Sequence, residues 1–183
     1  MSDNDATADG SNTAKSPGLD TIVVDPDDVV AAMRRNKRDE RQQRTHVLRV
    51  SPPFEGEKRA TPHVSEAHTY YPPEMVPEPL HIPPEAFLVG HSASSRHPDW
   101  RTEWSYPSRH EQRSLFRDEF GARDDGANRP LTDDEKDEWA EWWDTVVELW
   151  EDRVRHALKT TEELTITHHI ADTTVSVRFE TSN

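Results

Sequence analysis

A cluster of cationic side chains lies in a short window of an otherwise acidic chain. Between residues 34 and 59 there are nine basic and four acidic residues, a local balance of +5, whereas the whole chain has a formal net charge of −14. Guanidinium and ammonium groups gathered in this way bind phosphates, and the binding weakens as salt rises. The candidate anion-binding residues are Arg34, Arg35, Lys37, Arg38, Arg41, Arg44, Arg49, Lys58 and Arg59.

Two interpretations of this basic window are open. Helical spacing places Arg34, Lys37, Arg38, Arg41 and Arg44 close to one face of a helix. These cations either pair with the acidic remainder of the same protein or bind an anionic partner, which is a nucleic acid or an acidic protein. Concentrated salt weighs against the second interpretation, because counterion release then drives binding only weakly.

Four tryptophans follow one another at helical spacing near the middle of the second half of the chain. Such a stripe is more often core than interface, and this chain has few other large apolar residues to form a core. Tryptophan is also enriched at interface hot spots, so we expect part of the stripe to contact a protein partner. The candidate interface residues are Trp139, Trp142, Trp143 and Trp150.

Residue patterns typical of catalysis or metal binding are missing from the sequence. There are ten histidines, but none follow a metal-binding spacing, and the adjacent His168 and His169 point to opposite faces of a strand. No nucleophile elbow, phosphate-binding glycine loop or dinucleotide fingerprint occurs, and cysteine is absent. We therefore expect no catalytic residue, no metal and no cofactor, and the sequence favours a protein that is not an enzyme.

The basic window needs a helix and strands to position it. The pattern predicts a strand at 21–24, followed by a helix with Asp25 as N-cap and Pro26 in its first turn, which runs to about residue 43. It then predicts a strand at 45–50 with a partner strand at 58–64, and a short strand at 80–82.

The tryptophans need a long helix. Thr132 and Glu135 form a capping-box pattern, and the apolar spacing that follows predicts a helix to about Leu158. A hairpin of strands at 164–170 and 173–179 closes the chain. The region from about 90 to 130 is predicted to be a long irregular insertion, with a short helix over about 108–120.

Together these elements predict an α+β fold. A small antiparallel sheet packs against one long amphipathic helix and one shorter N-terminal helix. Residues 1–20 are predicted to be a disordered acidic tail, and residues 21–183 a single domain.

The overall charge indicates adaptation to salt. The chain has 36 acidic and 22 basic residues, with lysine at only five positions, and 32% of its residues are hydrophobic. Self-repulsion of this size destabilises a compact protein in ordinary buffer, and about 1 M salt screens most of it. The sequence has no apolar leader stretch and nothing near the roughly 18 apolar residues of a membrane span, so we expect a cytoplasmic protein.

The stretch Val47–Phe54, followed by Gly56 and by His63–Val64, resembles a family of small, acidic, uncharacterised haloarchaeal proteins. In that family a helix that opens with Asp-Asp-Val-Val precedes a Val-Leu-Arg-Val…Pro-Pro-Phe…Gly hairpin, and a later Trp- and Arg-containing helix precedes a closing strand. The resemblance covers roughly residues 22–88 and, more loosely, 136–180. It implies a salt-adapted protein with no assigned activity, so it carries over no functional residue.

The function is therefore not defined by the sequence. Its leading interpretation is a non-enzymatic protein-binding or adaptor protein of a salt-adapted organism. The alternative is a nucleic-acid-binding protein that uses the basic window 34–59.

Overall fold

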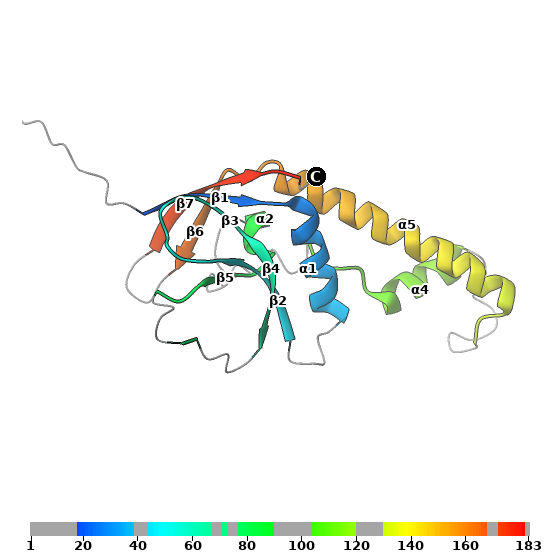
Figure 1. Ribbon diagram of the computed structural model, residues 1–183. Helices are drawn as coiled ribbons and strands as arrows, with labels where there is room; N and C mark the ends of the chain where they lie inside the picture. The colour runs from blue at the N-terminus through cyan, green and yellow to red at the C-terminus, as the bar shows by residue number, and fades with distance from the viewer. Residues whose placement is uncertain are drawn as a thin grey trace, which may run out of the picture.

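The computed structural model describes residues 18–38, 44–66, 71–72, 77–89, 104–119, 130–167 and 172–181. Figure 1 shows two small groups of strands beside a long helix that extends well past them. None of the helices that the structure describes is long and apolar enough to cross a membrane. The elements in chain order are β1 (Leu19–Val24), α1 (Pro26–Arg38), β2 (Arg44–Val50), β3 (Gly56–Arg59), β4 (Thr61–Glu66), β5 (Leu80–Ile82), α2 (Ala86–Val89), α4 (Arg109–Glu119), α5 (Asp133–Leu158), β6 (Glu163–Thr167) and β7 (Asp172–Phe179).

The described strands form two sheets. The first has the order β3-β1-β7-β6, with β1 parallel to both of its neighbours, and the second has the order β4-β2-β5, with antiparallel pairs throughout. The α+β class is confirmed, with the correction that there are two sheets, one of them mixed, instead of one antiparallel sheet. The reason is that β1 pairs with β3 and β7, which lie far from it in the sequence.

The chain passes from one sheet to the other at a single residue, Ala60. The expected partner strand at 58–64 is in fact divided there: residues up to Arg59 pair with β1, and residues from Thr61 pair with β2. Ala60 is buried, and its N–H donates to the carbonyl of Val23 over 2.8 Å. Before it, β3 opens at Gly56, whose φ of 59° lies in the left-handed region that favours glycine.

The N-terminal helix α1 begins as predicted. The backbone N–H of Asp27 donates to the Oδ1 atom of Asp25 over 2.9 Å, so Asp25 is the N-cap and Pro26 the first helical residue. Val29, Val30 and Met33 are buried, while the last turn carries Arg35, Lys37 and Arg38. Cations at this end interact favourably with the helix dipole. Residues 39–43, which we expected to continue the helix, lie outside the described residues.

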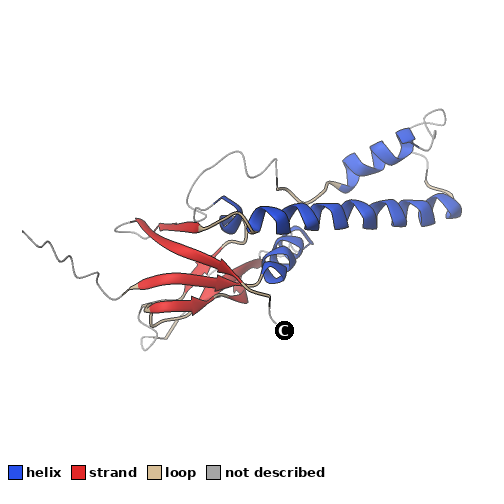
Figure 2. Ribbon diagram, turned by 90° about the horizontal axis from the view of Figure 1, so that it is seen from above, coloured by secondary structure: helices blue, strands red, loops and turns tan. Residues whose placement is uncertain are grey.

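The long helix α5 is confirmed with its capping box. The Thr132 N–H donates to Glu135 Oε2 over 2.7 Å, and the Glu135 N–H donates to Thr132 Oγ1 over 3.3 Å. The 26 residues span about 39 Å at 1.5 Å per residue. Figure 2 shows that only one end of the helix covers the strands, while its other end lies beside α4.

The main core joins α1, α5 and the inner faces of both sheets. Ile22, Leu48, Val154, Leu158 and Val175 are among its buried members. The predicted hairpin at 164–179 is confirmed as β6 and β7, and its turn lies outside the described residues. Between 90 and 130 the structure describes residues 104–119 and 130, and it confirms the short helix there as α4. Of the expected tail, residues 1–17 lie outside the described residues.

Candidate functional site

A cleft of about 650 Å³ brings together parts of the basic window and of the tryptophan stripe. It lies between the C-terminal half of α1, the segment that precedes and opens α4, and the middle of α5. We call it the α1–α5 cleft. Its lining residues are Ala31, Arg34, Arg35, Lys37, Arg38, Tyr106, Pro107, Arg109 and Trp143.

The cationic wall of the α1–α5 cleft comes mainly from one helix. Arg34, Arg35, Lys37 and Arg38 all lie in the last turns of α1 and are exposed. Arg109, at the start of α4, adds a fifth cation from a part of the chain about seventy residues away. Cations brought together from two elements favour a ligand that carries more than one negative charge.

The aromatic wall is made of two rings held by further ring contacts. The Tyr106 ring lies edge-on to Trp143, with centroids 6.0 Å apart, and edge-on to Trp150, with centroids 4.9 Å apart. Trp150 Nε1–H donates to the backbone carbonyl of Trp104 over 3.1 Å and so fixes the segment that carries Tyr106. The Arg109 guanidinium lies 5.1 Å from the Trp143 ring centroid, a cation–π contact.

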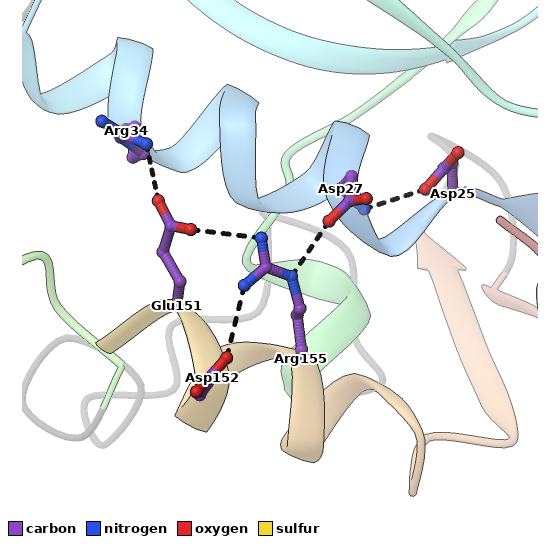
Figure 3. A network of polar contacts seen from close by, with 6 residues as sticks. All are labelled: Asp25, Asp27, Arg34, Glu151, Asp152 and Arg155. Atoms are coloured by element: carbon purple, nitrogen blue, oxygen red, sulfur yellow. Dashed lines mark hydrogen bonds and ion pairs between the residues drawn. The ribbon is translucent and has the colours of Figure 1, made fainter. Parts of the chain in front are cut away.

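Figure 3 shows a network of ion pairs that joins α1 to α5, and its member Arg34 also lines the cleft. Arg155 Nε donates to Asp27 Oδ1 over 2.9 Å, and Arg155 Nη2 donates to Glu151 Oε2 over 3.1 Å. The other oxygen of Glu151 accepts from Arg34 Nη1 over 2.6 Å, and Asp152 lies 3.5 Å from Arg155 Nη1. Because Arg34 takes part in this network, its position at the edge of the cleft is set by α5 as well as by α1.

The other predicted basic residues lie elsewhere. Arg44 begins β2, so our expectation that it shares a helix face with Arg34 is wrong, and Arg49 lies further along the same strand. Lys58 and Arg59 lie in β3, where Arg59 pairs with Glu180 over 3.2 Å. Arg41 lies outside the described residues. The structure thus brings four of the nine candidates together in the α1–α5 cleft.

The four tryptophans have different surroundings. Trp150 is 5% exposed and belongs to the core. Trp139 and Trp142 are partly buried and lie edge-on to Phe116 of α4, with ring centroids 5.5 and 6.0 Å from it. Trp143 lines the cleft. A protein interface at Trp139, Trp142 and Trp143 remains a prediction, whereas Trp150 is too deeply buried to contact a partner.

Sequence reasoning missed Tyr106 and Arg109. Tyr106 lies outside any helix or strand, and Arg109 lies in the first turn of a short polar helix. Neither position has a local motif, because their role depends on how α4 packs against α5. The aromatic residues that surround them in the sequence were the available signal, since isolated aromatics in a polar segment must pack somewhere.

A second polar cluster lies on the β4-β2-β5 sheet. The rings of His63 and His81 are stacked with centroids 5.0 Å apart, and the Tyr71 hydroxyl lies 2.7 Å from His81 Nε2. Burial, together with the charge of Arg49, lowers the pKa of His63. Burial also lowers the pKa of His81, aided by His63 and Arg49 and opposed by Glu78.

These two histidines make the stability of the protein depend on pH. A histidine whose pKa is lowered in the folded state takes up its proton first in the unfolded state, so acid favours unfolding. We expect the free energy of unfolding to fall as pH drops below about 6.5, the ordinary histidine pKa. Urea denaturation at a series of pH values measures this dependence. The variant His81→Gln should make the free energy of unfolding less dependent on pH. The control variant His110→Gln, at an exposed position of α4, should leave the dependence unchanged. The same dependence in the wild type and in both variants would show that His81 does not cause it.

Among the residues that the structure describes, no group of three or more histidine or carboxylate side chains is placed to hold a metal ion. None of the described residues that line the α1–α5 cleft carries a carboxylate. Its chemistry is that of cations beside aromatic rings, which suits a ligand with negative charges and a flat, polarisable part.

Fold and site together define a small α+β protein with a basic, aromatic cleft. The chain belongs to the family described as a domain of unknown function, DUF8009, whose model matches residues 9–181. That match runs across the 90–130 region, which the resemblance noted in the sequence does not cover. No significant similarity links the chain to a curated protein or to a solved structure.

Proposed function

We propose that the protein is a non-enzymatic nucleic-acid-binding protein and that the α1–α5 cleft is its binding site. The observation that carries the proposal is the meeting of five cations with the rings of Tyr106 and Trp143 in one cleft of about 650 Å³. Proteins that bind single strands combine a positive groove for the backbone with aromatic side chains on which bases stack. The cleft offers both within a few residues of each other.

We propose that the ligand is a single strand instead of a duplex. Tyr106 and Trp143 are partly buried within the cleft, where a base must leave its stack to reach them. An unpaired base reaches such a ring without the cost of opening a duplex. We therefore propose that Trp143 contacts a base and that Arg35, Lys37 and Arg38 contact the flanking phosphates.

Charge reversal in the cleft tests this proposal. The ligand is a fluorescently labelled oligothymidylate of eight nucleotides, and binding is measured by fluorescence anisotropy from about 50 mM to about 1 M KCl. We expect the double variant Arg35→Glu/Arg38→Glu to lower the affinity by at least about 100-fold at the lowest salt, because two phosphate contacts become repulsive. The control is the double variant Arg153→Glu/Lys159→Glu, at exposed positions outside the cleft. It makes the same change in net charge and should lower the affinity much less.

Two outcomes would refute the site. One is the absence of binding at about 50 mM salt by a protein whose circular dichroism shows it to be folded. The other is an equal loss of affinity in the two double variants, which would indicate a response to net charge alone.

An acidic protein is the second candidate for the same cations, because it is the other anionic partner that the charge pattern leaves open. A labelled polyglutamate peptide separates the two, because it supplies negative charge without bases. We expect Trp143→Ala to lower the affinity for the oligonucleotide by roughly 5- to 160-fold, the cost of about 1–3 kcal/mol for one lost stacking contact, and to leave peptide binding unchanged. Tighter binding of the peptide than of the oligonucleotide would favour the protein partner.

We also propose that the acidic surface is an adaptation to concentrated salt. The excess of 36 acidic over 22 basic residues supports this adaptation, because the repulsion among the carboxylates is screened only at high ionic strength. The thermal unfolding midpoint should rise between about 0.15 M and about 2 M KCl, by about 2–4 °C for each kcal/mol gained. Asp137→Lys/Glu148→Lys, at exposed positions of α5, should make the rise smaller. A midpoint that is independent of salt would contradict the adaptation.

A further inference from the structure

A second cleft lies on the other side of α1. It has a volume of about 390 Å³ and lies between α1 and the strands β2 and β4, and we call it the α1–β4 cleft. Arg35 lines this cleft as well as the α1–α5 cleft, so its side chain stands at the boundary between them. Figure 1 shows α1 placed between the β2–β4 strands on one side and α4 and α5 on the other.

The two clefts differ in chemistry. The α1–α5 cleft is lined by cations and two aromatic rings. Apart from the shared Arg35, the described lining of the α1–β4 cleft consists of Asp28 and of apolar or imidazole side chains such as Pro62, His63 and Val64. A carboxylate disfavours a phosphate, while apolar and imidazole surfaces accept the flat face of a base. The second cleft therefore suits a base, and Arg35 suits the phosphate that precedes it.

We infer that the ligand is an extended single strand that crosses α1, with one base in the α1–α5 cleft, a phosphate on Arg35 and a further base in the α1–β4 cleft. This inference rests on the function proposed above and adds the length and path of the ligand. A helix with its side chains is about 10–12 Å wide, so at least one further nucleotide lies between the two bases and a dinucleotide cannot fill both clefts. Sites of about 4–16 nucleotides are usual for folds that bind single strands.

A length series with a matched pair of variants tests the path. Labelled oligothymidylates of two and of eight nucleotides are compared by anisotropy at about 50 mM KCl. An octanucleotide contains seven overlapping dinucleotide positions, which by themselves raise its affinity by about sevenfold. We expect the octanucleotide to bind more tightly than the dinucleotide by well over that factor.

The diagnostic variant is Val64→Glu, which adds a carboxylate to the α1–β4 cleft at a side chain that is 39% exposed. We expect it to lower the affinity for the octanucleotide by about tenfold and to leave the dinucleotide unaffected. Leu149→Glu is the control, because it adds the same charge at an exposed side chain of α5 that lines neither cleft.

The outcomes separate this inference from the proposed function. If both ligands bind with affinities that differ only by the statistical factor, and Val64→Glu affects them equally, the path across α1 is wrong while the α1–α5 cleft stands. If neither ligand binds the folded protein, the proposed function fails and the path fails with it. A selective loss of octanucleotide binding in Val64→Glu supports the path.

Discussion

Replacement of Trp150 by alanine is expected to lower the free energy of unfolding by about 3–5 kcal/mol, as for other large aromatic side chains in cores. Trp150 is 5% exposed and packs in the main core with α1 and both sheets. The substitution removes this packing, the contact with Tyr106 and the hydrogen bond to the carbonyl of Trp104. A loss of this size is a large part of the total stability of a small protein.

Urea denaturation measures the loss, and the neighbouring residue supplies the control. Leu149 is 63% exposed on the same helix, so Leu149→Ala should change the free energy of unfolding by less than about 0.5 kcal/mol. Trp150→Phe keeps a ring in the core but loses the N–H donor, which should cost about 1–3 kcal/mol. If the alanine variants at 149 and 150 are equally stable, Trp150 does not have the core position described here.

Replacement of Phe116 by alanine should have a large but local effect. Phe116 is 1% exposed, is the buried residue of α4, and packs edge-on against Trp139 and Trp142. Its removal costs about 3–5 kcal/mol of packing, which exceeds what an isolated helix of eleven residues can supply. We therefore expect α4 to detach and unfold while the two sheets remain folded.

Hydrogen exchange distinguishes this local effect from global unfolding. In Phe116→Ala the amides of α4 should lose their protection, whereas those of β1 and β7 should keep theirs. Leu115→Ala, at a side chain that is 51% exposed on the same helix, should leave α4 protected. Loss of protection in β1 and β7 together with α4 would show that α4 belongs to the cooperative core and would contradict the prediction.

Elements with local signals were predicted from the sequence. The capping box at Thr132 and the alternation at Val175 and Val177 depend on residues that are neighbours in the chain, so they define α5 and β7 without further information. The partners of β1 were not predicted, because a short apolar strand carries no mark of which distant strand it joins. For the same reason the division of residues 58–64 between two sheets at Ala60 had no local signal.

The candidate site was predicted in part. The charge pattern identified Arg34, Arg35, Lys37 and Arg38 because they lie within five successive residues of the chain. It also included Arg49 and Arg59, which the fold places on strands away from the cleft. Linear clustering cannot distinguish the two groups, since it does not show which residues belong to α1 and which to the strands β2 and β3. The aromatic wall was not predicted because it is assembled by tertiary packing.

Ala60 has a consequence for the mechanics of the protein. Because β3 and β4 are joined through this one residue, the Cα atoms of Arg59 and Thr61 stay within about 7 Å of each other. The two sheets therefore cannot separate unless the ladder of one of them breaks. The buried Ala60 N–H, bonded to Val23, holds the junction itself in place. We expect the two sheets to melt in one cooperative transition, so that protonation of His81 in one sheet also weakens the ladder around β1 in the other.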